Sequence, residues 1–242
     1  MKILAKVQYL GTNYHGWQKQ DYDSSIQEEI EKVLSKILDT NIVIYGSGRT
    51  DAGVHALGQT FHFELKKDFD LERLIYAANA LLPSDIKLLS FAVVSDDFHA
   101  RYSAKGKHYQ YRISLVDKNP FLTNLVTFFP YSFDKELFKN ALKKFEGEHN
   151  FQDFTSKEQD EYKFVRIITK INVIYDDNIV KVDFYGNGFM RYMIRDIIGT
   201  ALEIARGKES LDYIDKHLDS KERKIVSYKA KSDGLYLIDV IY

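Results

Sequence analysis

Hydrophobic and polar residues alternate in several short stretches of the chain, and this alternation predicts β-strands. In the first of them, KILAKVQY, the residues at positions 3, 5, 7 and 9 are apolar. The predicted strands are residues 2–9, 41–45, 59–65, 86–94, 107–116, 165–175, 179–185 and 235–241. An Asp-Asp-Asn turn separates the strands 165–175 and 179–185, so we expect these two to form an antiparallel hairpin.

Other stretches repeat apolar residues every three or four positions, which is typical of amphipathic helices. The stretch SIQEEIEKVLSKIL places Ile26, Ile30 and Leu34 on one face, with Ser24 or Ser25 as the N-cap. The predicted helices are residues 25–38, 70–82, 134–145, 189–206 and 211–217. Pro83 ends the second of these helices, because proline cannot continue one.

The elements follow the order strand–helix–strand–strand–helix–strand, and this order occurs twice along the chain. Such an order is typical of α+β domains with antiparallel sheets. We therefore expect two α+β halves, residues 1–104 and residues 105–242, although the halves share no visible repeat in sequence.

The composition of the chain excludes several kinds of cofactor and catalytic group. The chain has no cysteine, so disulfides, thiolate nucleophiles and iron–sulfur clusters are excluded. Its seven histidines form neither H-x-H nor H-E-x-x-H, and we expect no metal site.

No apolar run approaches the ~20 residues that cross a bilayer, and the first residues lack a signal-peptide pattern, so we expect a cytoplasmic protein. The 34 Lys and Arg nearly balance the 35 Asp and Glu, which allows only a local basic surface.

The segment 46–58, GSGRTDAGVHALG, holds four glycines and a single carboxylate, Asp51, between two predicted strands. Glycine permits tight turns and close approach of the backbone to a ligand. A strand rather than a helix follows, which argues against a nucleotide-binding motif. Asp51 can act as a nucleophile or general base that Arg49 keeps ionised. On spacing alone, a turn aspartate is the simpler interpretation, and a Ser/His/Asp triad stays open although the sequence has no G-x-S-x-G motif.

Residues 99–113, HARYSAKGKHYQYRI, combine cations with tyrosines and contain no acidic residue. Arg101, Lys105 and Lys107 can contact phosphates, while the rings can stack on unpaired bases. Tyr109 shares a strand face with Lys107. A strand with core tyrosines and solvated cations fits these residues equally well.

Two further basic places lie in the second half. In the predicted helix 189–206, Arg191 and Arg195 are four residues apart and share a face. Arg195 lies at the edge of the apolar stripe, a suitable position for meeting a carboxylate, although a solvated arginine is commoner on helices. Residues 221–231 carry five cations against one acidic residue and predict a surface loop or a second RNA contact.

Five blocks of the sequence, taken together, resemble the bacterial tRNA pseudouridine synthase A family. They are YLGTNYHGWQKQ (9–20), GSGRTDAGVHALGQ (46–59), FHARYSAKGKHYQYRI (98–113), GNGFMRYMIRDIIGTALEIARGK (186–208) and GLYLIDVIY (234–242). The resemblance implies two ferredoxin-like (RRM-like) halves whose antiparallel sheets join around a central catalytic cleft. It also implies a homodimer that isomerises uridine to pseudouridine at nucleotides 38, 39 and 40 of the tRNA anticodon stem-loop, with no cofactor and no metal.

The resemblance also implies a role for each matched residue. Asp51 matches the catalytic aspartate of the family, and Arg49 matches the arginine that helps to move the target base out of the stack. Tyr109 matches the tyrosine that stacks on the target uracil. Arg195 matches the arginine that pairs with the aspartate, and Leu235 matches the apolar residue against the base. We expect Arg101, Lys105, Lys107 and Arg191 to be additional RNA contacts.

Two stretches depart from the family pattern. Leu10 replaces the aspartate of a usual Y-D-G, and residues 226–231 read VSYKAK where the family usually resembles A-G-P-T-A-P. Both lie outside the matched catalytic positions. They therefore bear on RNA contacts or target range rather than on chemistry.

The reaction breaks the N1–C1′ bond, turns the uracil and joins C5 to C1′, so it needs no oxidant or reductant. Because cysteine is absent, a carboxylate must do the covalent or basic work. Asp51 can attack C1′, attack C6 or remove a ribose proton, and the sequence does not choose among these. The alternative function is a tRNA-binding protein that remodels tRNA without catalysis. A glycoside hydrolase is disfavoured because it usually needs two carboxylates and the loop offers one.

Overall fold

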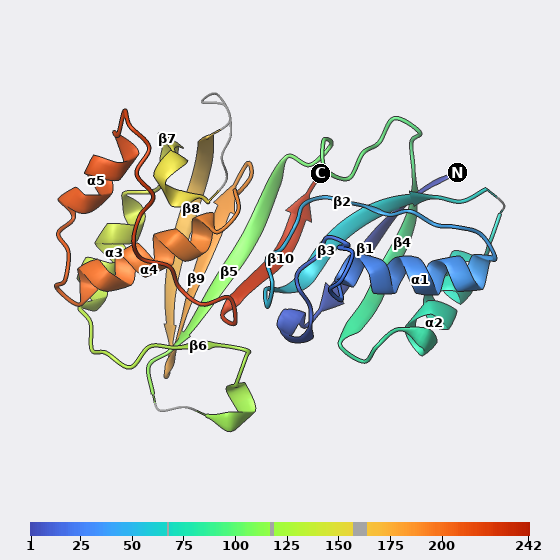
Figure 1. Cartoon of the computed structure of the whole chain (residues 1–242), viewed down its shortest axis with the longest axis horizontal. Coiled ribbons are helices and arrows are strands. Elements are labelled where there is room, and N and C mark those ends of the chain that lie inside the picture. The colour runs from blue at the N-terminus through green and yellow to red at the C-terminus, as the bar shows by residue number, and fades with distance from the viewer. Residues whose placement is uncertain (67, 117–118, 157–163) are drawn as a thin grey trace. The chain divides into compact units, whose positions relative to one another are not determined.

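The computed structural model describes residues 1–66, 68–116, 119–156 and 164–242 and shows a mixed α+β protein whose strands pair mostly antiparallel (Figure 1). The expected α+β class is confirmed. The chain forms two compact units, Met1–Lys105 with Tyr236–Tyr242 and Gly106–Leu235. The sequence-based boundary at residue 104 leaves the C-terminal strand with the second half, whereas Tyr236–Tyr242 group with the first unit. That residues 1–104 and 105–242 are separate domains therefore stays a prediction.

The first unit is built on the antiparallel strands β1 (Lys2–Tyr9), β3 (His55–Glu64) and β4 (Ile86–Val94), with β1 in the centre. The short β2 (Tyr45–Gly46) pairs with the end of β3, and β10 (Leu235–Ile241) runs parallel to its start. Alternate side chains of β1 are buried, as the alternating pattern predicts.

The helices α1 (Ile26–Leu38) and α2 (Leu71–Leu81) begin where capping side chains allow. Ser25 Oγ accepts a hydrogen bond from the backbone N–H of Glu28 at 3.3 Å, and Asp70 Oδ1 accepts one from that of Glu72 at 3.0 Å. These bonds satisfy N–H groups in the first turn that no helical carbonyl can reach. The predicted N-cap at Ser25 is therefore confirmed.

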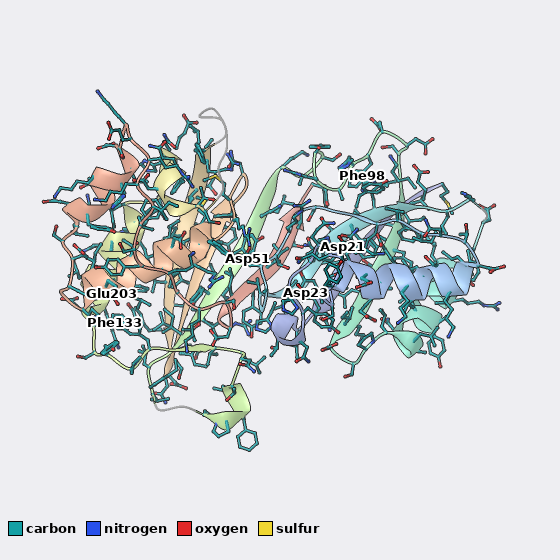
Figure 2. The ribbon with its side chains drawn as sticks, in the orientation of Figure 1. Asp21, Asp23, Asp51, Phe98, Phe133 and Glu203 are labelled. Carbon is teal, nitrogen blue, oxygen red and sulfur yellow. The ribbon has the colours of Figure 1, made fainter. Side chains whose placement is uncertain are left out.

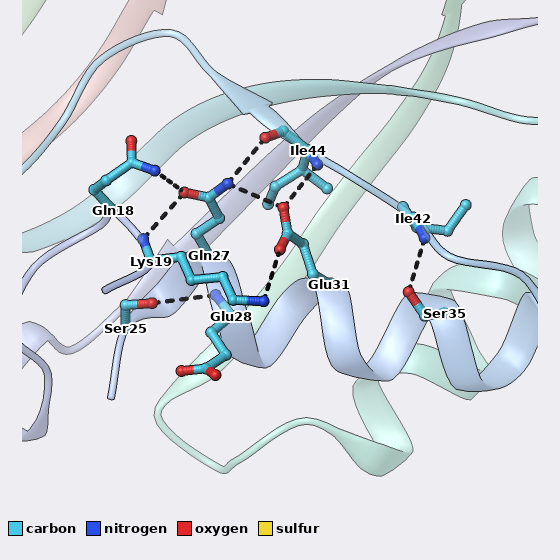
Figure 3. Close-up of polar contacts among 9 residues, drawn as sticks. All are labelled: Gln18, Lys19, Ser25, Gln27, Glu28, Glu31, Ser35, Ile42 and Ile44. Atoms are coloured by element: carbon cyan, nitrogen blue, oxygen red, sulfur yellow. Dashed lines mark hydrogen bonds and ion pairs between the residues drawn. The ribbon is translucent and has the colours of Figure 1, made fainter. Parts of the chain in front are cut away.

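The strand predicted for residues 41–45 is wrong over most of its length, since only Tyr45–Gly46 is paired as β2. Side chains of α1 bind this backbone in place of a partner strand (Figure 3). Ser35 Oγ accepts from the N–H of Ile42 at 2.9 Å, and Glu31 Oε1 accepts from that of Ile44 at 3.0 Å. Gln27 Nε2 donates to the carbonyl oxygen of Ile44 at 3.2 Å. The alternation here reflects burial of Ile42 and Ile44 rather than sheet pairing.

In the second unit, β5 (Gly106–Ser114) pairs antiparallel with β9 (Ile179–Gly186), β9 with β8 (Val165–Asp176), and β8 with β7 (Gly147–Asn150). The short β6 (Thr127–Phe128) runs parallel to β5. Neither β6 nor β7 was predicted, because such short strands leave no alternation to detect. The helices are α3 (Lys135–Lys143), α4 (Met193–Ala205) and α5 (Asp212–Leu218). Among the described residues, no helix is both long enough and apolar enough to cross a membrane.

Helix α4 begins four residues later than the apolar periodicity predicts. Tyr192 has a φ of 67°, a left-handed conformation through which a right-handed helix cannot continue. Arg191 therefore precedes the helix, and the predicted helix face shared by Arg191 and Arg195 is wrong.

A glycine in the middle of α4 makes room for the segment before β10, which runs across the helix (Figure 1). A Cβ at Gly199 would lie 2.8 Å from the backbone nitrogen of Lys229 and equally close to the carbonyl group of Tyr228. Any side chain at this position would displace that backbone. Residues 226–231 are therefore held against α4 by close packing.

Candidate active site

The glycine-rich loop between β2 and β3 is anchored to β3 at its start. The backbone N–H of Ser47 donates to the carbonyl oxygen of Thr60 at 2.8 Å, and the Ser47 hydroxyl donates to Gln59 Oε1 at 2.7 Å. Gln59 Nε2 in turn donates to the carbonyl oxygen of Gly48 at 3.1 Å. Ser47 and Gln59 are buried, so these bonds are shielded from water and fix the path of the loop.

Thr50 is the buried residue between the exposed Arg49 and the half-buried Asp51. Its carbonyl oxygen accepts from the N–H of Trp17 at 3.1 Å, and its hydroxyl lies 2.8 Å from Tyr9 Oη. Burial raises the pKa of Tyr9, so this phenol stays protonated near neutral pH. Both the backbone and the side chain of Thr50 are held, which fixes the backbone of its two neighbours.

Asp51 begins a tight turn. Its carbonyl oxygen accepts from the N–H of Val54 at 3.1 Å, and the N–H of Gly53 donates to the carbonyl oxygen of Tyr14 at 3.3 Å. Gly53 has a φ of 76°, which other residues rarely adopt. Figure 2 shows the Asp51 side chain on this loop. The structure thus combines a fixed backbone with a carboxylate that is only half-buried, which suits a nucleophile or a general base.

The histidines that follow Asp51 accept hydrogen bonds in the core. His55 Nδ1 accepts from the N–H of Gly11 at 3.1 Å, and His62 Nδ1 accepts from that of Ala100 at 3.2 Å. Burial, together with the nearby His99, lowers the pKa of His62 to about 4, so it is neutral near pH 7. A triad in which His55 donates from Nδ1 to an aspartate is excluded, because that nitrogen is already an acceptor.

Tyr109 lies on β5 with only 7% of its surface exposed, and its ring meets that of Phe189 edge-on at 5.3 Å between centroids. Two positions along the strand, Tyr111 is fully buried and donates to the carbonyl oxygen of Lys231 at 2.8 Å. Tyr111 is therefore a core residue. Tyr109 belongs to the same buried face of β5, and its ring contacts Phe189 at the start of the segment that leads to α4.

The predicted cations near β5 occupy different surroundings. Lys107 is half-buried on the strand itself, whereas Arg101 and Lys105 are exposed and belong to the first unit. The guanidinium carbon of Arg101 lies 5.8 Å from the ring centroid of Tyr102, which is 76% exposed. Arg101 and Tyr102 thus form a solvent-accessible pair of the kind that nucleic acids contact.

Arg195 is bound to the segment that crosses α4. Its Nε donates to the carbonyl oxygen of Ala230 at 2.8 Å, and its own carbonyl oxygen accepts from the N–H of Ala230 at 2.9 Å. Its guanidinium carbon lies 5.1 Å from the ring centroid of Tyr192. A carbonyl oxygen and an aromatic ring therefore orient the guanidinium.

Leu235 begins β10, is 6% exposed, and donates its N–H to the carbonyl oxygen of Ser232 at 2.9 Å.

The structure places Arg49 and Asp51 on one loop of the first unit, and Tyr109, Arg195 and Leu235 on three elements of the second. Within the second unit it also brings Arg191 and Arg195 to the ring of Tyr192. The residues that position these groups were not predicted; they include Tyr9, Gln59, Tyr192 and Ala230. Their contacts join distant parts of the chain, and the sequence carries no local signal for such contacts.

Comparison with known proteins finds relatives along the whole chain. A family model described as tRNA pseudouridine synthase matches residues 5–103 and 141–242. A protein of Streptococcus mutans named tRNA pseudouridine synthase A is 40% identical over 246 residues, covering 100% of this chain and 99% of that protein. A protein of the same name from Streptococcus pneumoniae (strain Hungary19A-6) is 39% identical over 248 residues, covering 100% and 98%. Among solved structures, a chain of a Cbf5–Nop10–Gar1 complex matches at 16% identity over 83% of this chain and 54% of that chain, with a TM-score of 0.37, too low to support an argument.

Proposed function

Because this chain belongs to the tRNA pseudouridine synthase family, we propose that it converts uridine to pseudouridine at nucleotides 38, 39 and 40 of the tRNA anticodon stem-loop. Membership makes the protein an isomerase that acts on tRNA. The nucleotide positions and the chemical role of Asp51 are the proposed parts.

The position of Asp51 in the loop supports its proposed role. It is the single carboxylate of the loop 46–58, and buried hydrogen bonds fix the backbone on both sides of it. A carboxylate whose backbone does not move loses little entropy when it meets its target atom. Asp51 acts as a nucleophile, on C1′ or C6, or as a base that removes a ribose proton.

The overall reaction balances without a second reactant. The N1–C1′ bond breaks, the C5–C1′ bond forms, C5 loses a proton and N1 gains one, so uridine and pseudouridine are isomers. The proposal accordingly includes no cofactor. The detached uracil must be held while it turns, and a ring at Tyr109 and an apolar wall at Leu235 serve that purpose.

Arg195 and Arg49 complete the proposed site. Arg195 pairs with Asp51 and keeps it ionised, and its fixed guanidinium, bound by the Ala230 carbonyl oxygen, supports that role. Arg49 is exposed and helps to move the target base out of the stack. Unstacking costs a few kcal/mol, which contacts between phosphates and basic side chains such as Arg101, Lys105 and Lys107 can offset.

The finer fold assignment belongs to the same proposal: two ferredoxin-like halves whose sheets join around a central catalytic cleft. The first unit supports it, because its strands follow the order β4-β1-β3-β2, all antiparallel, with a helix after β1 and after β3. We further propose that the protein is cytoplasmic and forms a homodimer. Sedimentation analysis of the purified protein tests the homodimer, and cell fractionation tests the location.

The decisive experiment is single-turnover pseudouridylation of an unmodified tRNA transcript, mapped by carbodiimide-stop primer extension. Asp51→Asn keeps the size of the side chain but removes its charge, so we expect product formation to fall by about 10³-fold or more. Affinity for tRNA should stay within about 3-fold, since one neutralised carboxylate does not remove phosphate contacts. Asp21→Asn is the matched control, because Asp21 is an exposed aspartate of the same unit (Figure 2).

Each other outcome contradicts a defined part of the proposal. Wild-type rates with Asp51→Asn would remove Asp51 from the chemistry. Stops outside nucleotides 38–40 would keep the chemistry and overturn the target assignment. Loss of tRNA binding together with a lowered melting temperature would show that Asp51 is a structural residue.

A further inference from the structure

Asp85 lies in the turn between α2 and β4, and hydrogen bonds hold its backbone there (Figure 1). The N–H of Ile86, the first residue of β4, donates to the carbonyl oxygen of Pro83 at 3.0 Å and closes the turn. The Asp85 carbonyl oxygen accepts from the N–H of Leu10 at 2.9 Å, directly after the end of β1. Because β4 also pairs with β1, Asp85 is fixed beside the segment that follows β1.

The carboxylate of Asp85 binds two side chains of that segment. Tyr14 Oη donates to Asp85 Oδ1 at 2.6 Å, and Asn13 Nδ2 donates to Asp85 Oδ2 at 3.2 Å. Tyr14 is buried whereas Asn13 is exposed, so the bond from Tyr14 is the better shielded from water. Burial, followed by the hydrogen bond and the charge of Asp85, raises the pKa of Tyr14, so its phenol stays protonated and can donate near neutral pH.

The backbone of Tyr14 connects this carboxylate to the turn at Asp51. The Tyr14 carbonyl oxygen accepts from the N–H of Gly53 at 3.3 Å. Gly53 lies inside the turn that the bond between the Val54 N–H and the Asp51 carbonyl oxygen closes. Tyr14 is thus held at its hydroxyl by Asp85 and itself holds one N–H of the turn that Asp51 begins.

The same segment also packs closely on this turn. A Cβ at Gly16 would lie 2.5 Å from the carbonyl oxygen of Thr50 and 3.2 Å from the carbonyl carbon of Asp51. The two stretches of backbone therefore pack with no side chain between them, and a shift of one displaces the other. Asp85 is linked to Asp51 both by hydrogen bonds through Tyr14 and by this packing.

We propose that Asp85 is a positioning residue for Asp51. Its carboxylate holds Tyr14, and Tyr14 holds the turn that Asp51 begins. The inference rests on the proposed function, because it takes Asp51 as the group that reacts with the target uridine. A displacement of about 1 Å at a reacting group can lower a rate by about 10²-fold, so a residue that holds the turn can control turnover through Asp51.

The test uses single-turnover pseudouridylation at saturating tRNA with three variants. Asp85→Ala removes the acceptor and Tyr14→Phe removes the donor, and each should lower the rate by about 10–100-fold. Asp85→Asn keeps an acceptor oxygen for the phenol and should stay within about 5-fold of wild type. The bond from Leu10 uses the backbone of Asp85 and is available in every variant, so the comparison isolates the side chain.

A double variant shows whether the two residues act through one bond. Asp85→Ala combined with Tyr14→Phe should be no more than about 3-fold slower than the slower single variant, because effects through a shared contact do not add. Affinity for tRNA should stay within about 3-fold in all variants, since none of them removes a cation. Asp21→Ala and Tyr22→Phe, an exposed aspartate and an exposed tyrosine of the same unit, are the matched controls and should keep the wild-type rate.

Hydrogen exchange separates positioning from a general loss of structure. The amides of residues 51–54 should exchange faster in Asp85→Ala and Tyr14→Phe, while the amides that pair β1 with β3 remain protected. Faster exchange throughout the first unit would make Asp85 a general stability residue and overturn the inference. A wild-type rate in Asp85→Ala, a loss of affinity as large as the loss of rate, or an Asp85→Asn variant as slow as Asp85→Ala would overturn it as well.

A failure of this inference is distinguishable from a failure of the proposed function. If Asp51→Asn abolishes product and Asp85→Ala keeps the wild-type rate, only this inference is contradicted. If Asp51→Asn keeps the wild-type rate, the role of Asp51 is contradicted, and exchange at residues 51–54 in Asp85→Ala still tests the link between Asp85 and the turn. Product at other nucleotides together with a slow Asp85→Ala variant contradicts only the target assignment.

Discussion

At the residue scale, small buried polar groups hold the backbone of the loop that carries Asp51. Gln59 donates to the carbonyl oxygen of Gly48 in the loop, and the carbonyl oxygen of Thr50, the residue before Asp51, accepts from the N–H of Trp17. Neither Gln59 nor Thr50 contacts substrate in the proposed mechanism. Their burial makes these bonds costly to break, because a freed polar group would lack water. The backbone of Asp51 is therefore positioned by residues that take no part in the proposed chemistry.

His62 provides a residue-scale prediction about pH. Its pKa is lowered from 6.5 to about 4 in the folded protein, so the unfolded chain binds a proton between these values and the folded chain does not. Stability contributed by neutral His62 is thus lost as pH falls from 6.5 toward 4. In urea unfolding, the stability of wild type relative to His62→Gln should rise between pH 4 and pH 6.5 and stay constant above pH 7.

The control for this measurement is His15→Gln. His15 is exposed, so its replacement removes a histidine without changing the core. Its difference from wild type should not rise over the same range. Parallel pH profiles for wild type and His62→Gln would contradict the lowered pKa.

At the element scale, helix α1 both packs into the core and binds the backbone of a neighbouring segment. Its apolar residues join the core of the first unit, while Gln27, Glu31 and Ser35 bind the backbone of residues 42–44 (Figure 3). Glu31 is a charged residue with only 9% exposure, and Lys19 Nζ lies 3.8 Å from its second oxygen. The helix therefore takes the place of a sheet partner for the segment that leads into the glycine-rich loop 46–58.

We expect Glu31→Ala to lower the free energy of unfolding by about 1–3 kcal/mol, because the buried N–H of Ile44 loses its acceptor. Glu31→Gln keeps an acceptor oxygen and should lose less. Glu28→Ala is the control on the same helix, since Glu28 is only half-buried and the bonds to residues 42–44 come from Gln27, Glu31 and Ser35. It should change stability by less than about 0.5 kcal/mol. Equal losses for Glu31→Ala and Glu28→Ala in urea unfolding would contradict the role of Glu31.

At the scale of the whole molecule, the last residues of the chain complete the first unit. Tyr236 and Leu237 pair with His55 and Ala56 at the start of β3, directly after the Asp51 turn. Tyr242 Oη donates to the carbonyl oxygen of Ala100 at 2.9 Å, and Lys6 Nζ lies 2.8 Å from Oδ1 of Asp239. The glycine-rich loop 46–58 is thus supported by residues from the opposite end of the sequence.

Removal of residues 236–242 should therefore disturb the first unit more than the second. We expect faster hydrogen exchange at the β3 amides and loss of turnover, while the amides that pair β8 with β9 remain protected. Ile241→Ala is the control, because that side chain is 47% exposed and its removal leaves the backbone pairing intact. Uniform loss of protection in both units would show instead that the chain unfolds as one body.

Local patterns predicted the long elements well. The strands 2–9, 86–94 and 235–241 agree with β1, β4 and β10, because alternation along an extended chain records which face is buried. The start of α4 could not be predicted this way, since Met190 is buried like a helical residue although it precedes the turn at Tyr192. The motif residues of the site were found in the sequence, whereas the residues that position them were not.

The sequence by itself determined the α+β class, the lengths of most elements, the family and the identity of the loop carboxylate, because each depends on residues that are close in the chain or on a motif. Only the tertiary structure decided that α1 binds residues 42–44, that Thr50 is held by Tyr9 and Trp17, and that Lys229 meets Tyr192. These contacts join residues that are between 7 and 41 positions apart in the chain. Their free energy depends on packing and on shielding from water, which no local pattern records.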